Sequence, residues 1–245
     1  MRFPSVWTAR GRRRELCAVA IAALTMILAN GTAEAVQRRA FVTSIKGTGD
    51  LSTWQHAAGT TAQERADAIC RFLAGDAQPS ALPNAGSYRA WLSTTEASAY
   101  CHVQGFTGTQ ENGCHDAVLP GAGPWFLSNG LTLATASLDD LVEQGEIYRS
   151  FLLDENGAPI SGSNVERNYW TGTTKAGELS DDHHCADWTV GTDAATGASG
   201  DAYGAAESWT LSAWGGCAST QRLLCLEPSP GDGALPGWAP GASRV

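Results

Sequence analysis

The sequence lacks the short motifs that identify several large classes of enzyme. It contains no Gly-x-Ser-x-Gly nucleophile elbow, no His-Glu-x-x-His zinc motif and no phosphate-binding glycine-rich loop after a strand. The acidic pairs Asp139-Asp140 and Asp154-Glu155 fall at an expected helix start and an expected turn, where capping and solvation explain them. We therefore predict no catalytic residue, no cofactor and a non-enzymatic role.

Basic residues are scarce relative to acidic ones. The chain has 16 lysines and arginines against 25 aspartates and glutamates, so its formal net charge is −9 at pH 7. Nucleic acid and anionic membrane surfaces would repel such a chain. We expect neither as a partner.

Long apolar runs are missing, apart from one near the N-terminus. Residues 16–29 are largely apolar, follow the arginines between Arg10 and Arg14, and precede Ala33-Glu34-Ala35, a small-x-small cleavage pattern. A run of about 14 residues is shorter than the roughly 20 that a membrane-spanning helix needs. The pattern predicts a signal peptide over residues 1–35 and no integral membrane segment after its removal. We expect export to the periplasm, the cell surface or the medium.

No Cys-x-x-Cys pair occurs among the seven cysteines, which disfavours a zinc ribbon or a thioredoxin-like centre. Cys17 lies in the predicted signal peptide, and the even number that remains predicts disulfides in an exported protein. Six cysteines can pair in about 15 ways by counting alone. The segment between Cys101 and Cys114 is rich in Gly, Thr and Asn and cannot order itself by burial, so we pair these two.

The local patterns predict one mixed α+β domain over residues 36–228. The clearest helix starts at the capping box Thr61-Ala62-Gln63-Glu64 and carries an apolar stripe through Ile69 and Leu73. A shorter capped helix is expected at 137–142. Strands are expected at 39–44, 88–93, 150–153 and 223–227, around Trp170 and Trp188, and in a hairpin over 124–133 with Asn129-Gly130 at its turn. The Gly-rich residues 193–208 predict a long loop, and the Pro/Gly-rich residues 229–245 predict a disordered tail.

An ordered set of segments resembles a known family. The set comprises Phe41-Val42-Thr43-Ser44, a helix with Cys70, Tyr88-Arg89-Ala90-Trp91-Leu92-Ser93, Trp170-Thr171-Gly172-Thr173, Cys185-Ala186-Asp187-Trp188 and Leu224-Cys225-Leu226-Glu227. Over residues 39–227 the chain is similar to the endostatin-like branch of the C-type lectin-like fold, in particular to a bacterial domain of exported proteins, including endostatin-like surface proteins of spirochaetes. The resemblance implies disulfides between Cys70 and Cys225 and between Cys185 and Cys217, with Cys101–Cys114 as a third bridge.

The chain departs from the sugar-binding members of that fold at their calcium site. Those lectins use a Glu-Pro-Asn or Gln-Pro-Asp triplet and a Trp-Asn-Asp triplet, because Ca²⁺ prefers several oxygen ligands. Neither triplet is present, and Ser212-Ala213-Trp214-Gly215-Gly216 stands before Cys217. We therefore expect any ligand binding to be independent of calcium.

The expected function is a secreted or cell-surface binding module that recognises a protein or a glycan through residues 187–216. Asp187, Trp209 and Trp214 are the candidate ligand-binding residues, although core packing under the loop is the favoured interpretation of the two tryptophans. Asp181, His183 and His184 are weak metal candidates, for which a polar loop before a strand is the simpler interpretation. Two alternatives stay open: a zinc-dependent hydrolase or metal-stabilised site near Asp181–His184, and a structural envelope protein.

Overall fold

A computed structural model of the chain describes residues 37–116 and 123–228. The predicted signal peptide and the predicted disordered tail lie outside the described residues. All described residues belong to one compact unit. Within these two ranges, no helix combines the length and the apolar character needed to cross a membrane.

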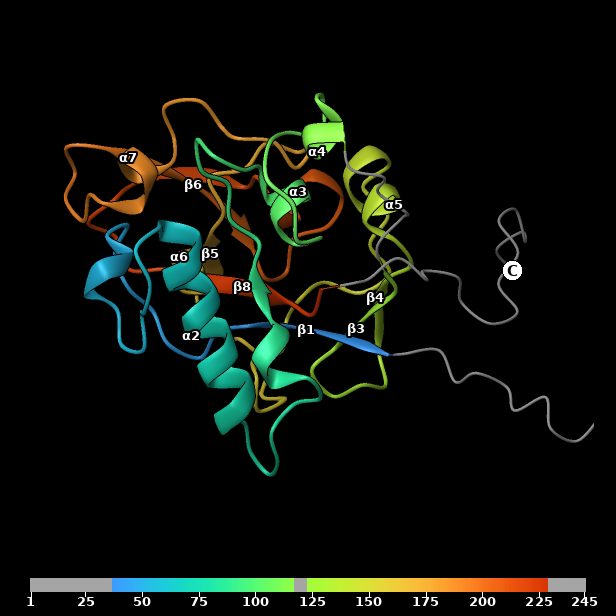
Figure 1. The fold of residues 1–245 in the computed structure, drawn as a ribbon. Coiled ribbons are helices and arrows are strands. Elements are labelled where there is room, and N and C mark those ends of the chain that lie inside the picture. Colours follow the sequence, from blue (N-terminus) through green and yellow to red (C-terminus); the bar gives the residue numbers. More distant parts are fainter. Residues whose placement is uncertain (1–36, 117–122, 229–245) are drawn as a thin grey trace, which may run out of the picture. The chain divides into compact units, whose positions relative to one another are not determined.

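The fold is mixed α and β and is built on one eight-stranded sheet (Figure 1). The strands run in the order β4-β3-β1-β8-β5-β6-β7, and β2 pairs with β8 beside this path. Neighbouring strands are antiparallel except for the β1–β3 and β5–β8 pairs, which are parallel. The strands are β1 (Arg38–Val42), β2 (Arg89–Ala90), β3 (Trp125–Leu127), β4 (Leu133–Thr135), β5 (Asn168–Trp170), β6 (Thr196–Asp201), β7 (Ala213–Gly216) and β8 (Arg222–Leu226).

The two central strands, β1 and β8, are covered on both faces. The sequence of such a strand is a continuous apolar run, because successive side chains pack into the two cores on opposite faces of the sheet. One core receives Ala40, Val42, Leu224 and Leu226, and the other receives Phe41, Leu223 and Cys225. The run Leu223-Leu224-Cys225-Leu226 is therefore fully buried.

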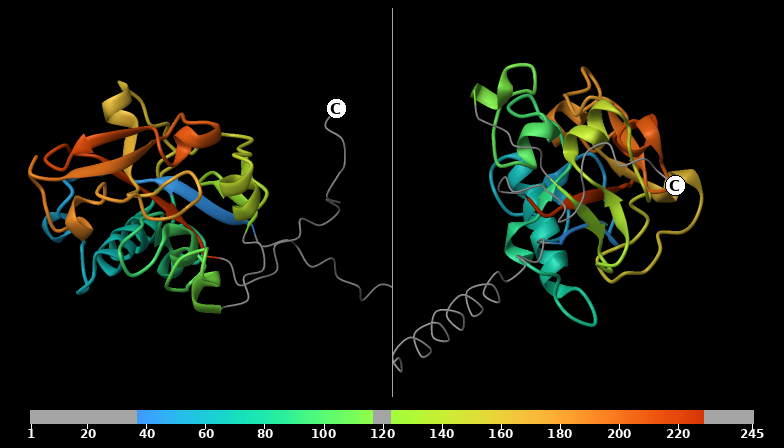
Figure 2. Two further views of the ribbon diagram at one scale, coloured as in Figure 1. Left: turned by 90° about the horizontal axis from the view of Figure 1, so that it is seen from above. Right: turned by 90° about the vertical axis from the view of Figure 1, so that its right-hand side faces the viewer.

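Helix α2 (Ala62–Asp76) covers one of these faces (Figure 1). Its predicted capping box is confirmed: Thr61 Oγ1 accepts from Glu64 N at 3.2 Å, and Glu64 Oε2 accepts from Thr61 N at 3.0 Å. In the left view of Figure 2, α2 (teal) and the β6–β7 pair (orange to red) lie on opposite sides of β1 (blue). The other helical segments are short: α3 (Ala99–His102), α4 (Gly113–Asp116), α5 (Leu138–Glu143), α6 (Asn164–Arg167), α7 (Cys185–Trp188), η1 (Leu51–Thr53), η2 (Ala85–Ser87) and η3 (Ala206–Trp209).

Three sequence predictions are wrong in detail. Residues 150–153 form no strand, because Leu153 makes only an isolated bridge to Pro159. The segment around Trp188 is not a strand but the turn α7, whose four residues have φ between 51° and 60°. The predicted loop 193–208 contains strand β6, which pairs with both β5 and β7. The predicted hairpin around Asn129-Gly130 is present as β3–β4, but its second strand lies at Leu133–Thr135 and not at residues 131–133.

Three disulfides cross-link the fold. Cys70–Cys225 joins α2 to β8, Cys185–Cys217 joins α7 to the residue after β7, and Cys101–Cys114 joins α3 to α4. These are the pairs named in the sequence analysis. Such bridges are consistent with an exported protein, because disulfides persist in oxidising compartments.

Candidate functional site

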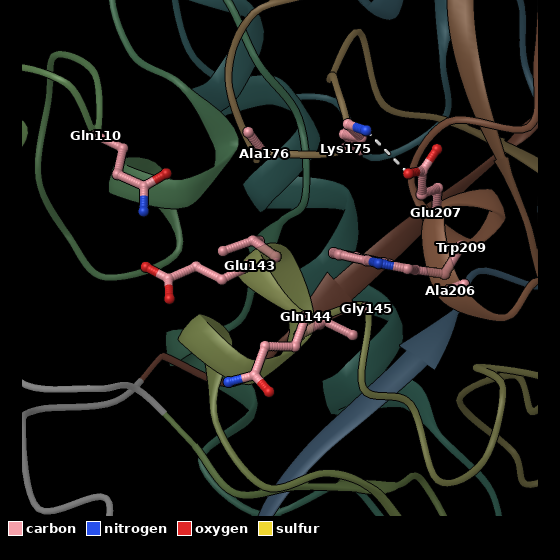
Figure 3. A pocket seen from close by; sticks show the side chains of 11 residues that line it. Gln110, Glu143, Gln144, Gly145, Lys175, Ala176, Ala206, Glu207 and Trp209 are labelled. Atoms are coloured by element: carbon pink, nitrogen blue, oxygen red, sulfur yellow. Dashed lines mark hydrogen bonds and ion pairs between the residues drawn. The ribbon is translucent and has the colours of Figure 1, made fainter.

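A pocket of about 460 Å³ lies between the end of α5, the turn at residues 175–176 and η3 (Figure 3). Its polar lining comes from four separate segments of the chain. Apolar side chains from α5 and η3, together with Ala176, complete the wall. The polar residues are Gln110, Glu143, Gln144, Lys175 and Glu207.

Helix α5 is positioned by its cap and by its buried face. Ser137 Oγ accepts from Asp140 N at 3.0 Å and so begins the helix, while Leu141 and Val142 pack into the core. The chain leaves α5 through Gly145, whose φ is +63°. A β-carbon at this position would lie 3.1 Å from Ala206 Cα. Glycine is therefore required both for the turn and for the close approach of η3.

Trp209 forms the rigid floor of the pocket rather than an exposed platform. Only 1% of its surface is accessible, and its ring lies 4.9 Å from that of Trp91 and 5.9 Å from that of Phe151. Tyr169 donates its hydroxyl hydrogen to the Trp209 carbonyl oxygen. In Figure 3 the indole extends from η3 between Lys175 and Gln144. Trp209 thus lacks the exposed ring that a binding platform requires, and core packing, the favoured interpretation of the sequence, describes it correctly.

The pocket carries two carboxylates and one ammonium group. Lys175 Nζ and Glu207 Oε1 form an ion pair at 2.9 Å (Figure 3), with both side chains about two-thirds exposed. The backbone of Gln110 is held in place because its main-chain N–H donates to Glu178 Oε1 at 2.6 Å. Burial raises the pKa of Glu178 above its ordinary value. The pocket therefore offers amide, carboxylate and ammonium groups around an apolar floor, with a small excess of negative charge.

A second exposed feature lies on β7. Trp214 has 62% of its surface exposed, and its ring stacks on His183 with a centroid distance of 4.6 Å and an interplanar angle of 15°. A hydrogen bond of 2.8 Å between His183 Nδ1 and Thr196 Oγ1 fixes the imidazole to β6. Of the predicted ligand-binding residues, Trp214 is the one with an available aromatic face.

Asp187 is engaged in holding the turn α7. Its carboxylate accepts from the backbone N–H and the hydroxyl of Thr95, and its own N–H donates to His184 Nδ1 at 2.9 Å. The turn is further fixed by Trp188, whose indole N–H donates to Ser93 O at 2.8 Å. Four consecutive left-handed residues other than glycine cost roughly 1–2 kcal/mol each. These bonds and the Cys185–Cys217 disulfide offset that cost.

The weak metal candidates do not come together in one site. Across residues 37–116 and 123–228, no group of three or more His, Cys, Asp or Glu side chains is placed to hold a metal ion. His183 bonds to Thr196, whereas His184 accepts from Asp187 N. Asp181 is exposed to solvent.

Sequence reasoning missed the pocket residues Gln110, Glu143, Gln144 and Lys175. They lie in separate segments, and no local motif marks them. Comparison with known proteins adds no assignment: no protein-family model matches the chain, and a search of curated proteins finds no match.

Proposed function

We propose that the chain is an exported, non-enzymatic binding module of C-type lectin-like architecture, which binds a neutral glycan in the pocket without calcium. The observation that carries the proposal is the pocket itself, with its rim of amide, carboxylate and ammonium groups.

The topology supports a C-type lectin-like architecture. The first and last strands pair in the middle of the sheet, and a disulfide joins the main helix to the last strand. A second disulfide brackets the segment between α7 and β7. Both bridges have the positions that the sequence resemblance implies, and their presence also supports export.

The chemistry of the pocket favours a neutral polyhydroxylated ligand. Phosphate and sulfate groups would be repelled, because Glu143 and Glu207 outnumber Lys175. The amides of Gln110 and Gln144 both donate and accept hydrogen bonds, as sugar hydroxyls do. The exposed apolar part of the lining, from Ala176 and Ala206, suits contact with the C–H groups of a sugar ring, and the volume is within the usual range for small-ligand sites.

The same geometry favours binding over hydrolysis. Glycosidases use two carboxyl groups, one of which is shielded in an apolar environment so that it stays protonated. Here Glu143 is exposed, and the Glu207 side chain is 65% exposed and ion-paired to Lys175. Neither has the surroundings of a catalytic acid. No feature of the described residues favours a zinc-dependent site or a structural envelope protein.

The test is a glycan-array screen of the purified, oxidised chain in EDTA, followed by titration of the best neutral glycan. We expect saturable binding that Ca²⁺ leaves unchanged. Each direct hydrogen bond contributes about 1 kcal/mol, so Gln144→Ala is expected to weaken binding about fivefold. Gln55→Ala is the matched control, because Gln55 is exposed and lies outside the pocket. Absence of glycan binding, or equal loss in both variants, would overturn the proposal.

A further inference from the structure

Strand β7 is an open edge of the sheet. It ends the strand order and pairs only with β6. The hydrogen bond from Cys217 N to Ala195 O, at 3.0 Å, fixes the phase of this antiparallel ladder. Because inward and outward groups alternate along such a strand, the N–H and C=O groups of Trp214 point away from β6. Outside the strand ladders, they form no backbone hydrogen bond within residues 37–116 and 123–228.

The side chains beside this edge suit contact with another chain. Trp214 is largely exposed, and its stack on His183 restricts its ring. Gly215 and Gly216 bring no side chain that would block an approaching strand. Proteins commonly protect sheet edges with lysine, proline or bulges, and β7 has neither lysine nor proline.

The charge around the edge is negative. Residues 176–221 contain seven acidic residues and neither lysine nor arginine. Asp201 and Glu207 of this segment are ion-paired, to Arg167 and Lys175. Asp193 lies directly against the edge, because a β-carbon on Gly216 would collide with its Oδ1. No lysine or arginine of residues 37–116 or 123–228 forms an ion pair with Asp193.

We propose that β7 binds an extended, lysine- or arginine-bearing segment of another protein by strand addition. The peptide backbone would bond to the outward N–H and C=O of Trp214, as in other cases where a peptide extends a sheet. A basic side chain would lie over the exposed face of the Trp214 ring, a cation–π arrangement, or near the carboxylate of Asp193. The site is separate from the glycan pocket and does not depend on it.

A second copy of this chain is the less suitable occupant. Pairing two β7 strands would bring two acidic segments together, and like charges across an interface are unfavourable. A cationic peptide instead complements the charge. The Cys185–Cys217 disulfide holds the edge in place before binding, which lowers the ordering cost of association.

The test uses a capped seven-residue peptide, Thr-Lys-Val-Lys-Val-Lys-Thr, titrated calorimetrically into the oxidised chain. Two peptides serve as controls. In one, glutamate replaces lysine. The other is N-methylated along both of its edges, so that its backbone N–H groups cannot bond to a neighbouring strand. We expect the lysine peptide to bind with a dissociation constant below about 1 mM. Both controls should bind at least about tenfold more weakly, because one loses the charge and the other the strand hydrogen bonds.

Variants of the protein assign the binding to β7. Trp214→Ala should weaken binding at least about tenfold, as expected for a tryptophan at the centre of an interface. Asp193→Asn should weaken it and reduce its salt dependence, whereas Leu131→Ala, an exposed apolar residue of the β3–β4 turn, should bind as the wild type does. No saturable binding of the lysine peptide, or unchanged binding to Trp214→Ala, would overturn the proposal. A Trp214-dependent dimer in sedimentation would also overturn it, by assigning the edge to a second copy.

Discussion

Replacing Gly200 by alanine is expected to destabilise the fold by about 2–3 kcal/mol. Gly200 lies in β6 opposite Tyr169 of β5. A β-carbon at Gly200 would collide with the carbonyl oxygen of Trp209 and lie 2.6 Å from Tyr169 Cε2. Overpacking of this kind costs roughly 1–3 kcal/mol. The upper part of that range applies, because the obstacles are backbone and a buried ring rather than the end of a flexible side chain.

Thermal unfolding followed by circular dichroism measures this effect. For a domain of this size a loss of 2–3 kcal/mol corresponds to a midpoint about 5–10 °C lower. Gly215→Ala is the matched control, because the nearest atom to its added β-carbon is Gln221 Nε2 at 3.5 Å. There the smaller entropy of the unfolded chain should leave stability unchanged or raise it by up to about 1 kcal/mol.

The comparison separates two views of the glycine-rich segment. If residues 193–208 were the flexible loop that their composition predicts, Gly200→Ala would be as neutral or stabilising as the Gly215→Ala control. Equal midpoints for Gly200→Ala and the wild type would refute the packing argument.

Two further predictions concern stability. The chain-entropy model predicts that Cys70–Cys225, which closes 155 residues, stabilises the fold by about 5 kcal/mol, and that Cys101–Cys114, which closes 13, contributes about 3 kcal/mol. Urea titration of the two double-alanine variants measures both losses of stability. A larger loss for the shorter loop would contradict this order. The capping box lowers the pKa of Glu64 to about 2, chiefly through the backbone N–H of Thr61. The ionised Glu64 therefore stabilises the folded state fully above the unfolded pKa of 4.5, and this stabilisation is lost as the pH falls toward 2. Melts of Glu64→Gln and the wild type should therefore differ most above pH 5 and converge near pH 2; a constant difference would exclude this linkage.

Local signals in the sequence are sufficient where each element is determined by its own residues. The capping box at Thr61 and the apolar stripe through Ile69 and Leu73 specify α2 without reference to the rest of the chain. Asn129-Gly130 likewise marks the β3–β4 turn, in which Gly130 supplies a positive φ of 69°.

Strand β6 has no such local signal. Glycine is a poor strand former, so Thr196–Asp201 reads as a loop. Its glycines are required because bulky groups fill the space beside them: a β-carbon at Gly197 would lie 2.7 Å from Trp170 Cζ3 and 2.8 Å from Cys185 Sγ. Tertiary packing, rather than propensity, makes this segment a strand.

The turn α7 and the pocket also depend on tertiary context. No local pattern predicts left-handed φ at four consecutive residues other than glycine, because the bonds from Thr95 and the bond to Ser93 come from far along the chain. The pocket is assembled in the same way from distant segments. The backbone N–H of Gln110 is held by the carboxylate of Glu178, which lies far along the chain. The ion-paired Lys175 and Glu207 are 32 residues apart in the sequence.

The pocket and the β7 edge share strand β6 as their support. Gly200 packs against the backbone of Trp209 at the pocket floor, and Ala198 lies opposite Trp214 at the edge. A change inside β6 should therefore alter both proposed binding activities, since it displaces both neighbours. A change in a rim residue such as Gln144 should alter glycan binding alone, because Gln144 has no part in β6 or β7. If Gly200→Ala, still folded below its melting midpoint, reduced glycan binding but left peptide binding intact, the edge would be held by the Cys185–Cys217 disulfide rather than by β6.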